Sequence, residues 1–555
     1  MRTMHVLEAV SVRRPLWSLM ATGLAIMVLG GETRASVSPE SLYDAMPLQT
    51  VMSTAGGDER VLRDFYDSRG YRLIWLGHDT ASSQRLHALT VALDGAESHG
   101  IPTELVMRDA LHGLVIDHRD PFAVAQADAA ISRIYLNYAQ ILSNGLLKPS
   151  EVSELIAVRK MSDRDDLDHL TGITGPNPTE YLAGLAPQEP AYQAMRATLQ
   201  SMREVTAGGG WGQIVQADHQ LMPGESGEAV IALRNRLIRM GYLPRTSSPD
   251  YDLYLMQAVQ AFQVEHGLEM TGIADAYTLD AINVSAEERI QQLISSLERM
   301  RWNVIRPAEK KIIVNIPEFK ARIYAGDDVL FESNVVVGKT DDDLQTPEFS
   351  DYMEYVVINP DWNVPYSIIT EEILPEVISG RNDWLEVEFL NKDRIPIDRS
   401  EIDFSAFREG GGFPFRARQL PGPTNPLGTV KFMFPNRHNI YLHDSPMRDF
   451  FTRQIRTYSH GCVRVMEAAS LARQLLVHQG VDYDGLIRAT RGTDDQVHVY
   501  LQEHIPVHIT YQSVVHRDGR ITFRNDIYGR DKLIYETIVN SGIVNEDIEQ
   551  DQAAG

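Results

Sequence analysis

The chain has 555 residues, 43% of them hydrophobic, and a formal net charge of −24. Such a length predicts about three domains of ordinary globular composition. The negative charge argues against a nucleic-acid partner, because phosphate binding needs clustered lysine and arginine, and we interpret the charge as a source of solubility.

Residues 1–36 have the pattern of an export signal. Arg13 and Arg14 precede residues 16–30, which contain no charged side chain, and small residues flank Arg34 where a signal peptidase would cut. The apolar stretch is shorter than the roughly 20 residues of a membrane span, so a cleaved signal is favoured. An uncleaved N-terminal anchor is the alternative.

Residues 37–217 are expected to form a mainly helical scaffold domain. Apolar residues recur at three- and four-residue spacing in residues 86–96 and 127–142, which is typical of amphipathic helices. The same pattern returns over residues 286–302, so residues 284–305 are expected to continue the scaffold.

Between these parts, residues 218–283 are predicted to form a compact three-helix unit. Its turns are marked by Pro223-Gly224, Gly241-Tyr242 and Gly267-Leu268. These offsets, together with Phe262-Gln263, resemble the three-helix peptidoglycan-binding module of wall enzymes. A generic three-helix bundle is the alternative, and in either case the unit is expected to be an insertion with its termini close together.

In residues 306–490 the pattern changes to short strands separated by turns, which predicts a sheet-rich domain. The strands are expected at residues 312–315, 329–338, 354–358, 429–434 and 439–442. Residues 371–420 are less regular and include Gly410-Gly411-Gly412, so they are a candidate capping insertion over a site. Residues 491–555 are expected to contribute C-terminal strands and an acidic tail.

The only cysteine of the chain, Cys462, directly follows a glycine and stands two residues after His460. An unpaired cysteine in an exported protein suggests a reactive group or intermolecular pairing. A second histidine, His443, lies at the expected end of a strand. We interpret Cys462 and His443 as a thiol nucleophile and its base. A helix expected from about Arg464 would add a dipole that favours the thiolate.

The neighbours of this pair have expected roles of their own. Asp444 is expected to orient the imidazole through either its carboxylate or its main-chain carbonyl. Gly461 leaves room for a substrate carbonyl and lets the main-chain N–H groups of residues 460–462 converge into an oxyanion hole. His460 is expected to be a structural hydrogen-bonding residue of the loop, and Arg464 either binds a substrate carboxylate or braces the loop.

Two interpretations without a nucleophile stay open. A lone cysteine can be an inert buried residue. A zinc site could in principle use His438, His443, His460 and Cys462, although structural zinc sites usually contain more than one cysteine at close spacing. We therefore expect no metal and no cofactor.

The sequence around the pair resembles the YkuD-type L,D-transpeptidases, whose pattern is a histidine, a gap, and then Ser/Thr-His-Gly-Cys-x-Arg. Here His443 is followed by Ser459-His460-Gly461-Cys462-Val463-Arg464. Residues 337–339, 346–347, 359–365 and 425–428 also look like the framework of the large Gram-negative members. One departure is Met466-Glu467, where a helix start containing proline is expected.

The resemblance implies a multidomain α+β protein. A β-rich YkuD-like catalytic domain of mixed sheets, with its capping insertion, would accompany the helical scaffold and the peptidoglycan-binding domain. The implied reaction is acyl transfer between peptidoglycan stem peptides in the periplasm, without a cofactor. Cys462 would form a thioester with the third stem residue, D-Ala would leave, and an amine of a neighbouring stem would complete a 3→3 cross-link. Carbapenems would acylate the same sulfur, and other wall-synthesis enzymes are possible partners.

The candidates for the substrate cleft are Arg464, Ser459, Tyr441, Trp362 and Asn425, of which the last three are equally compatible with packing. Two rival functions stay open. One is a thiol L,D-carboxypeptidase or amidase in which water resolves the acyl-enzyme, with lipoprotein attachment as a related option. The other is a non-catalytic wall-binding scaffold in which residues 218–283 are the working part.

Overall fold

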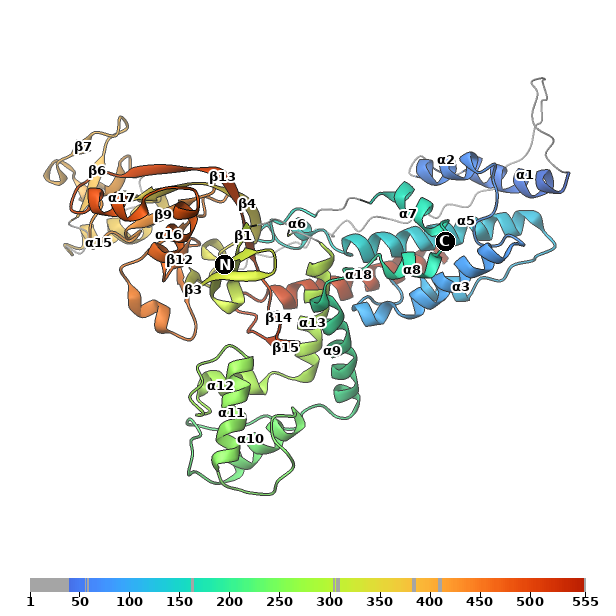
Figure 1. Ribbon diagram of the computed structural model, residues 1–555, viewed down its shortest axis with the longest axis horizontal. Helices are drawn as coiled ribbons and strands as arrows, with labels where there is room; N and C mark the ends of the chain where they lie inside the picture. Colours follow the sequence, from blue (N-terminus) through green and yellow to red (C-terminus); the bar gives the residue numbers. More distant parts are fainter. Residues whose placement is uncertain are drawn as a thin grey trace. The chain divides into compact units, whose positions relative to one another are not determined.

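A computed structural model describes residues 39–553, apart from 55, 57–58, 161–163, 303–304, 306–309, 382–385 and 408–411, with side chains described between residues 45 and 541. The described residues divide into two compact units, one within residues 39–302 and 513–553 and the other within residues 305–512 (Figure 1). The expected export signal lies outside the described residues. Within the described residues, no helix is long and apolar enough to cross a membrane.

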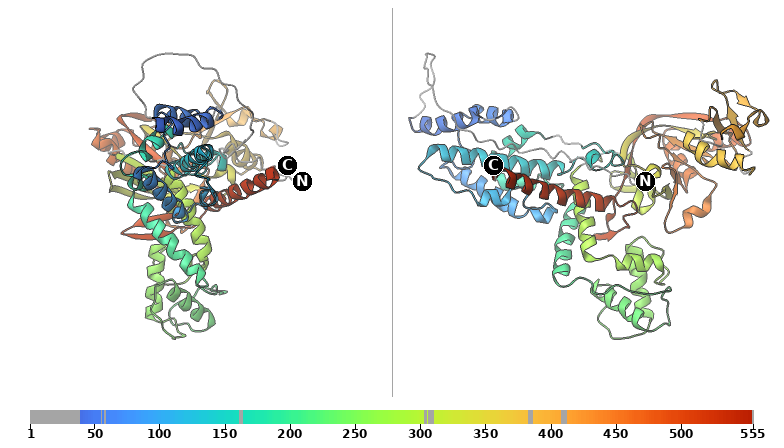
Figure 2. Two further views of the ribbon diagram at one scale, coloured as in Figure 1. Left: turned by 90° about the vertical axis from the view of Figure 1, so that its right-hand side faces the viewer. Right: turned by 180° about the vertical axis from the view of Figure 1, so that it is seen from behind.

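The first unit is helical, as the spacing of its apolar residues predicted. Its longer scaffold helices are α1 (Pro39–Ser53), α2 (Arg60–Ser68), α3 (Thr80–Asp94), α5 (Pro121–Asn144), α7 (Asp166–Ile173), α9 (Pro190–Ala207), α13 (Ala286–Arg301) and α18 (Arg530–Ala553). Helices α9 and α13 lie side by side in both views (Figures 1 and 2). Helix α13 begins at a capping box formed by Ser285 and Glu288, and its face carrying Leu293 and Leu297 is fully buried.

Residues 218–283 form three short helices, α10 (Glu228–Arg239), α11 (Leu253–Glu265) and α12 (Ala276–Asn283), around their own core. The buried Gln263 amide joins α11 to α12 and to the turn between them, because it donates to Thr271, Thr278 and the carbonyl of Ile273 and accepts from the N–H of Gly272. A buried amide with all these partners specifies one arrangement of the connecting turns.

The second unit is built on a nine-stranded mixed sheet with the order β11-β3-β12-β10-β9-β4-β13-β1-β2. The strands are β1 (Lys310–Asn315), β2 (Lys320–Ala325), β3 (Asp328–Gly338), β4 (Phe349–Ile358), β9 (Val430–Met433), β10 (Leu442–His443), β11 (Thr457–Ser459), β12 (Val463–Val465) and β13 (Val497–Thr510). One face of the sheet carries Leu442, Phe432 and Val463, which are fully buried. The helices α16 (Ala468–His478) and α17 (Tyr483–Thr490) pack against strands β9 and β4. The chain is thus a multidomain α+β protein with mixed sheets, as predicted.

The inserted segment folds into a small sub-domain with its own aromatic core. A four-stranded sheet with the order β5-β8-β6-β7 comprises β5 (Trp362–Asn363), β8 (Arg416–Gln419), β6 (Val387–Leu390) and β7 (Pro396–Ile397). The short consecutive helices α14 (Tyr366–Ile368), η5 (Ile369–Ile373) and α15 (Leu374–Ile378) precede it. The insertion therefore starts nearer Trp362 than residue 371, and two glycines of its Gly-Gly-Gly run lie outside the described residues.

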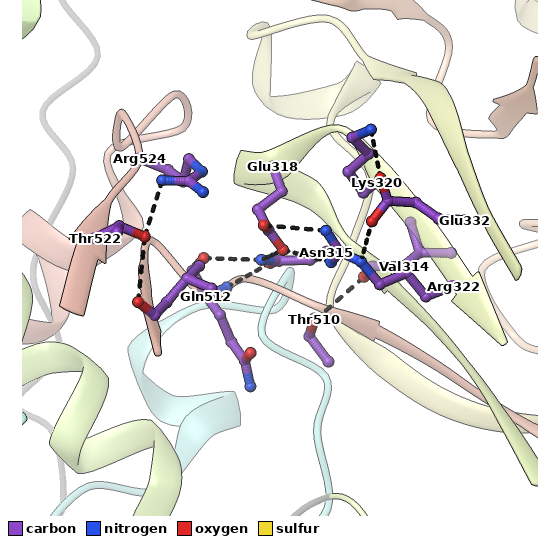
Figure 3. A network of polar contacts seen from close by, with 11 residues as sticks. Val314, Asn315, Glu318, Lys320, Arg322, Glu332, Thr510, Gln512, Thr522 and Arg524 are labelled. Atoms are coloured by element: carbon purple, nitrogen blue, oxygen red, sulfur yellow. Dashed lines mark hydrogen bonds and ion pairs between the residues drawn. The ribbon is translucent and has the colours of Figure 1, made fainter. Parts of the chain in front are cut away.

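Polar residues tie the β1–β2 corner to the end of β13 (Figure 3). Asn315 donates to the carbonyl of Gln512 and accepts from its N–H, at 3.0 and 2.8 Å. Arg322 bridges Glu318 and Glu332, each at 2.7 Å. Burial alone would raise the pKa of Glu332, but hydrogen bonds from Lys320 and Arg322 hold it at about 2.

Two expectations about chain organisation are corrected by the structure. The segment from residue 491 is divided, since β13 pairs with β1 and β4 inside the large sheet whereas residues 513–555 belong to the helical unit. The helix expected from about Arg464 does not begin there. Val463 and Val465 place their β-branched side chains in strand β12, and the helix starts only at Ala468.

Candidate active site

Cys462 lies immediately before strand β12, at a bend of the chain. A strand and a turn separate Cys462 from helix α16, so this helix does not begin at the thiol as the dipole argument expected. The Cys462 Sγ is half-buried and its hydrogen-bond acceptor is the carbonyl oxygen of Asn439, at 3.8 Å.

Strand register brings the expected pair to one face of the sheet. In the parallel pairing of β10 and β12, His443 lies opposite Arg464 and Leu442 opposite Val463. The bond from Val463 N–H to the Tyr441 carbonyl, at 3.1 Å, continues this register so that Tyr441 lies opposite Cys462. Side chains alternate along strands, so His443 and Cys462 share a face as diagonal neighbours, about 7–8 Å apart at their Cβ atoms.

The imidazole of His443 is held in one tautomer. Its Nδ1 lies 2.6 Å from the main-chain carbonyl oxygen of Asp444, and a carbonyl can only accept, so Nδ1 carries the proton. The Nε2 atom is then the basic nitrogen. The orienting group is therefore the carbonyl of Asp444, which resolves the choice that the sequence left open.

Burial governs the protonation of both groups. It lowers the pKa of His443 to about 3, helped by the positive charges of Arg464 and Lys431, so the ring is neutral near pH 7. Burial also raises the pKa of the Cys462 thiol, while hydrogen bonds from Tyr441 and the charges of Lys431 and Arg464 act in the opposite direction. The resting site therefore pairs a thiol with a neutral imidazole.

The expected hydrogen bond between the two groups is not formed. Within the described residues, the polar contacts of His443 and of Cys462 go to other partners. Tyr441 lies next to both, since its ring centroid is 5.6 Å from that of His443 and it lies opposite Cys462 in the strand register. Catalytic hydrogen bonds are often long in enzymes without substrate and shorten when substrate binds.

The Asp444 carboxylate has a structural task. It accepts from the N–H and the hydroxyl of Thr429, both at 2.9 Å, and pairs with Arg448 at 3.1 Å. Gly428 has a φ of +59°, and a Cβ at this position would overlap the Asp444 carboxyl group. Gly428 is thus a site residue that sequence reasoning missed, although the stretch 425–428 was noticed.

The loop before Cys462 is braced from two sides. The Ser459 hydroxyl is buried and donates to the Cys462 carbonyl, so Ser459 shapes the loop and is not open to a substrate. The Thr346 hydroxyl donates to the Gly461 carbonyl at 2.7 Å and accepts from the N–H of Gly338 at 2.9 Å. Gly461 has a φ of +100°, which an L-residue would adopt only with strain.

These contacts leave a row of free donors beside the sulfur. In the described part of the chain, the main-chain N–H groups of residues 460–462 donate to no protein acceptor. Successive unpaired N–H groups are uncommon near a protein interior, and beside a nucleophile they are suited to binding an oxyanion.

His460 connects this loop to the insertion. Its Nε2 lies 2.6 Å from a carboxylate oxygen of Glu372, which belongs to helix η5. His460 thus links the loop to the insertion through Glu372, a partner that sequence spacing could not identify.

Three family sequence models match the chain. The description "L,D-transpeptidase catalytic domain", of the YkuD family, matches residues 309–499, which include both His443 and Cys462. The chain contains a YkuD-type L,D-transpeptidase catalytic domain. "Scaffold domain" matches residues 60–199, and "Putative peptidoglycan binding domain" matches residues 226–282.

Similar proteins carry related descriptions. A Haemophilus influenzae protein described as "Putative L,D-transpeptidase" is 33% identical over 269 residues, which are 48% of this chain and 53% of that protein. The match thus spans about half the length of this curated relative.

Two solved structures also match, both L,D-transpeptidases. One, from Xylanimonas cellulosilytica, is 14% identical, with 53% of this chain and 99% of that chain covered and a TM-score of 0.17. The other, from Stackebrandtia nassauensis, is 14% identical, with 56% and 100% covered and a TM-score of 0.21. The assignment rests on the sequence matches.

The remaining candidate residues of the L,D-transpeptidase domain have different surroundings. Trp362 is 6% exposed in the core of the insertion, and the fully buried Asn425 amide bonds to the carbonyls of Pro360 and Leu420. Both are packing residues and not cleft residues. Arg464 is half-buried over the Phe450 ring, with no acidic partner within hydrogen-bond distance in the described residues.

The residues of the alternative zinc site in this domain bond to separate partners. His438 accepts from Arg437, His443 bonds to Asp444, and His460 bonds to Glu372. Among the residues described, no group of three or more His, Cys, Asp or Glu side chains is arranged to hold a metal ion.

Proposed function

We propose that this chain is a peptidoglycan L,D-transpeptidase that forms 3→3 cross-links through a thioester on Cys462. The observation that carries the proposal is the orientation of His443. Its Nδ1 proton is bound by a main-chain carbonyl, so its basic Nε2 remains for the thiol on the same face of the sheet. The family match over residues 309–499 supports the class of reaction.

In the acylation step, Nε2 of His443 takes the proton of the Cys462 thiol as the sulfur attacks the carbonyl carbon of the third stem residue. The N–H groups of residues 460–462 would hold the resulting oxyanion. The C–N bond to D-Ala then breaks, and the imidazolium returns its proton to the leaving amine. A positioned histidine contributes about 10²–10⁴ to such a reaction.

In the second step, an amine of a neighbouring stem peptide attacks the thioester carbonyl and loses a proton to His443. The C–S bond breaks, the thiol is restored, and the new amide is the cross-link. Carbapenems would acylate the same sulfur, because their ring carbonyl presents an equivalent electrophile.

The proposed location is the periplasm, with export directed by residues 1–36. The match to a peptidoglycan-binding domain supports peptidoglycan as both substrate and anchoring surface. Other wall-synthesis enzymes as partners stay a prediction.

The test is product analysis. The full chain and its Cys462→Ala variant are incubated with muropeptides that carry tetrapeptide stems, and products are separated and weighed. The unaltered chain is expected to produce cross-linked dimer and free D-Ala, and Cys462→Ala is expected to produce neither. Dimer formed by Cys462→Ala would overturn the proposal, and tripeptide without dimer would replace transpeptidation with hydrolysis.

A further inference from the structure

A cavity of about 250 Å³ lies on the sheet face that bears Cys462. It is lined by Tyr355, Val357, Lys431 and Met433 of the sheet and by Arg394 and Arg418 of the insertion. In the register of the sheet, Met433 lies opposite Tyr355 and Lys431 lies opposite both His443 and Val357. The cavity thus continues directly from the catalytic residues.

The lining of this cavity is positively charged, in a chain whose net charge is −24. It contains Lys431, Arg394 and Arg418 against one carboxylate, that of Asp361. Arg418 pairs with Glu388 at 2.8 Å. Without Arg418, whose charge Glu388 neutralises, the lining still has two cations, Lys431 and Arg394, and one carboxylate, that of Asp361.

Lys431 is the cation closest to the chemistry. Its ammonium lies 3.9 Å from the centroid of the Tyr441 ring, and it forms no ion pair with any described residue. Burial lowers the pKa of Lys431, while the neighbouring Cys462 and Asp361 act against this. A half-buried cation without an acidic partner is costly, and an anionic ligand would offset that cost.

Arg394 occupies a strained turn between β6 and β7. Its φ is +61°, unusual for a residue with a side chain, and the turn is closed by bonds between Asn391 and residues 394 and 395. Backbone strain of this kind is often retained where a side chain must be presented to a ligand.

Spacing limits what part of a substrate can reach these cations. Met433 lies two strands from Cys462, a separation of about 10 Å at about 4.8 Å per strand. An extended peptide covers at most about 3.5 Å per residue, so the cavity lies within about three residues of the acylated carbonyl.

We propose that this cavity is a subsite for a free carboxylate of the donor peptide, bound by Lys431 and Arg394. The inference rests on the proposed acyl transfer and specifies its substrate: an acidic peptide whose carboxylate lies on the acylated residue or within about three residues of it. The enzyme would then discriminate against donors in which that carboxylate is an amide.

The experiment compares donor tetrapeptides that differ in one group. One carboxylate at a time, on the side chain of the acylated residue, on the residue before it or on the leaving D-Ala, is converted to the carboxamide. The kcat/KM for acylation of Cys462 is measured for acid and amide donors with the full chain, Lys431→Met, Lys431→Arg and Arg394→Gln. Lys320→Met is the matched control, because Lys320 pairs with Glu332 on strand β2 and lines no part of the cavity.

The unaltered chain and Lys320→Met are expected to prefer one acid donor over its amide by at least about tenfold, the usual worth of a hydrogen bond to a charged group. Lys431→Met should reduce this ratio to within about threefold, Arg394→Gln should reduce it less, and Lys431→Arg should retain it. Because Lys431 also acts on the thiol, Lys431→Met slows both donors, and the ratio removes that shared effect.

The outcomes separate the two proposals. Equal rates for acid and amide donors with the unaltered chain, or an unchanged ratio in Lys431→Met, overturn the subsite and leave acyl transfer intact. Absence of any acyl-enzyme with the unaltered chain overturns the proposed function itself. Alkylation of Cys462 by neutral iodoacetamide and the unfolding temperature show that each variant is folded.

Discussion

Two cavities in the described part of the chain differ in charge. The cavity of the sheet unit, about 250 Å³, is lined by Lys431, Arg394 and Arg418. The cavity of the three-helix module, about 740 Å³, is lined by residues 215–220, 229, 276, 279, 280 and 283, which include Asp218 and Asp280 but no lysine or arginine. Under the proposed function, this difference corresponds to a division of labour in which the sheet unit selects acidic peptide and the module binds another part of the wall.

The largest effect is expected from His443→Ala, which removes the base while leaving the module untouched. Acylation by a tetrapeptide donor should fall by about 10³, because the pKa of the buried Cys462 thiol is raised and the thiol needs a proton acceptor. Stopped-flow mass spectrometry measures the rate, and pelleting with purified wall sacculi measures binding. A loss of wall binding in the same variant would break the division of labour.

Gly428→Ala should act on the catalytic cavity through geometry alone. The added Cβ would overlap the Asp444 carboxyl group, and displacement of this residue moves the carbonyl that holds His443. We expect an activity loss of about 10², the usual result of a misplacement near 1 Å, and a stability loss of about 2 kcal/mol. Gly326→Ala is a control, since Gly326 also has a positive φ but nothing lies within 4 Å of a Cβ there. Equal effects of the two substitutions would contradict this account.

The stability of the sheet unit should depend on pH through its buried neutral histidines. Burial lowers the pKa of His443 to about 3 and that of His508 to about 4, from an ordinary value of 6.5. Between pH 6.5 and these lower values, the unfolded chain binds more protons than the folded chain. The stabilisation of the folded state is therefore complete above pH 6.5 and is lost as the pH falls towards 3 to 4. Each histidine contributes a slope of up to about 1.4 kcal/mol per pH unit.

Urea denaturation at several pH values, with near-UV circular dichroism as the signal, checks this dependence. His508→Gln removes one titrating group and should flatten the slope between pH 4 and 6.5. An unchanged slope in this variant would show that His508 is not buried in its neutral form.

The smallest effect is expected in the module. Ala229→Trp places a large side chain in the second cavity. It should weaken wall binding about fivefold, because it blocks part of a small interface. Acylation of the soluble tetrapeptide should not change. Reduced acylation would show that the two cavities do not act separately.

The sequence predicted the elements of the site better than their arrangement. The pattern around Cys462 and His443 was sufficient to propose both residues, because it is local. The role of Lys431 depended on which strands pair with β9, a long-range property that periodicity does not contain. The helix expected from about Arg464 is present but begins only at Ala468, because the burial of Val463 and Val465 in the sheet outweighs the helical tendency of the residues that follow.

Other misses have equally specific causes. Trp362 and Asn425 were candidates for the cleft because aromatic and amide side chains often bind substrates, yet both are used in packing. Gly428 was not predicted, because the overlap between a Cβ at this position and the Asp444 carboxyl group arises only in the folded chain. Whether the carboxylate or the main-chain carbonyl of Asp444 orients His443 could be decided only from the structure.

The central claim is that Cys462 becomes acylated, and the most direct measurement is the intact mass of the protein after incubation with a carbapenem. The account predicts a gain of one carbapenem mass on the unaltered chain, mapped to the peptide that contains Cys462, and no gain on Cys462→Ala. An adduct on Cys462→Ala, or an unmodified mass for the folded unaltered chain, would contradict it.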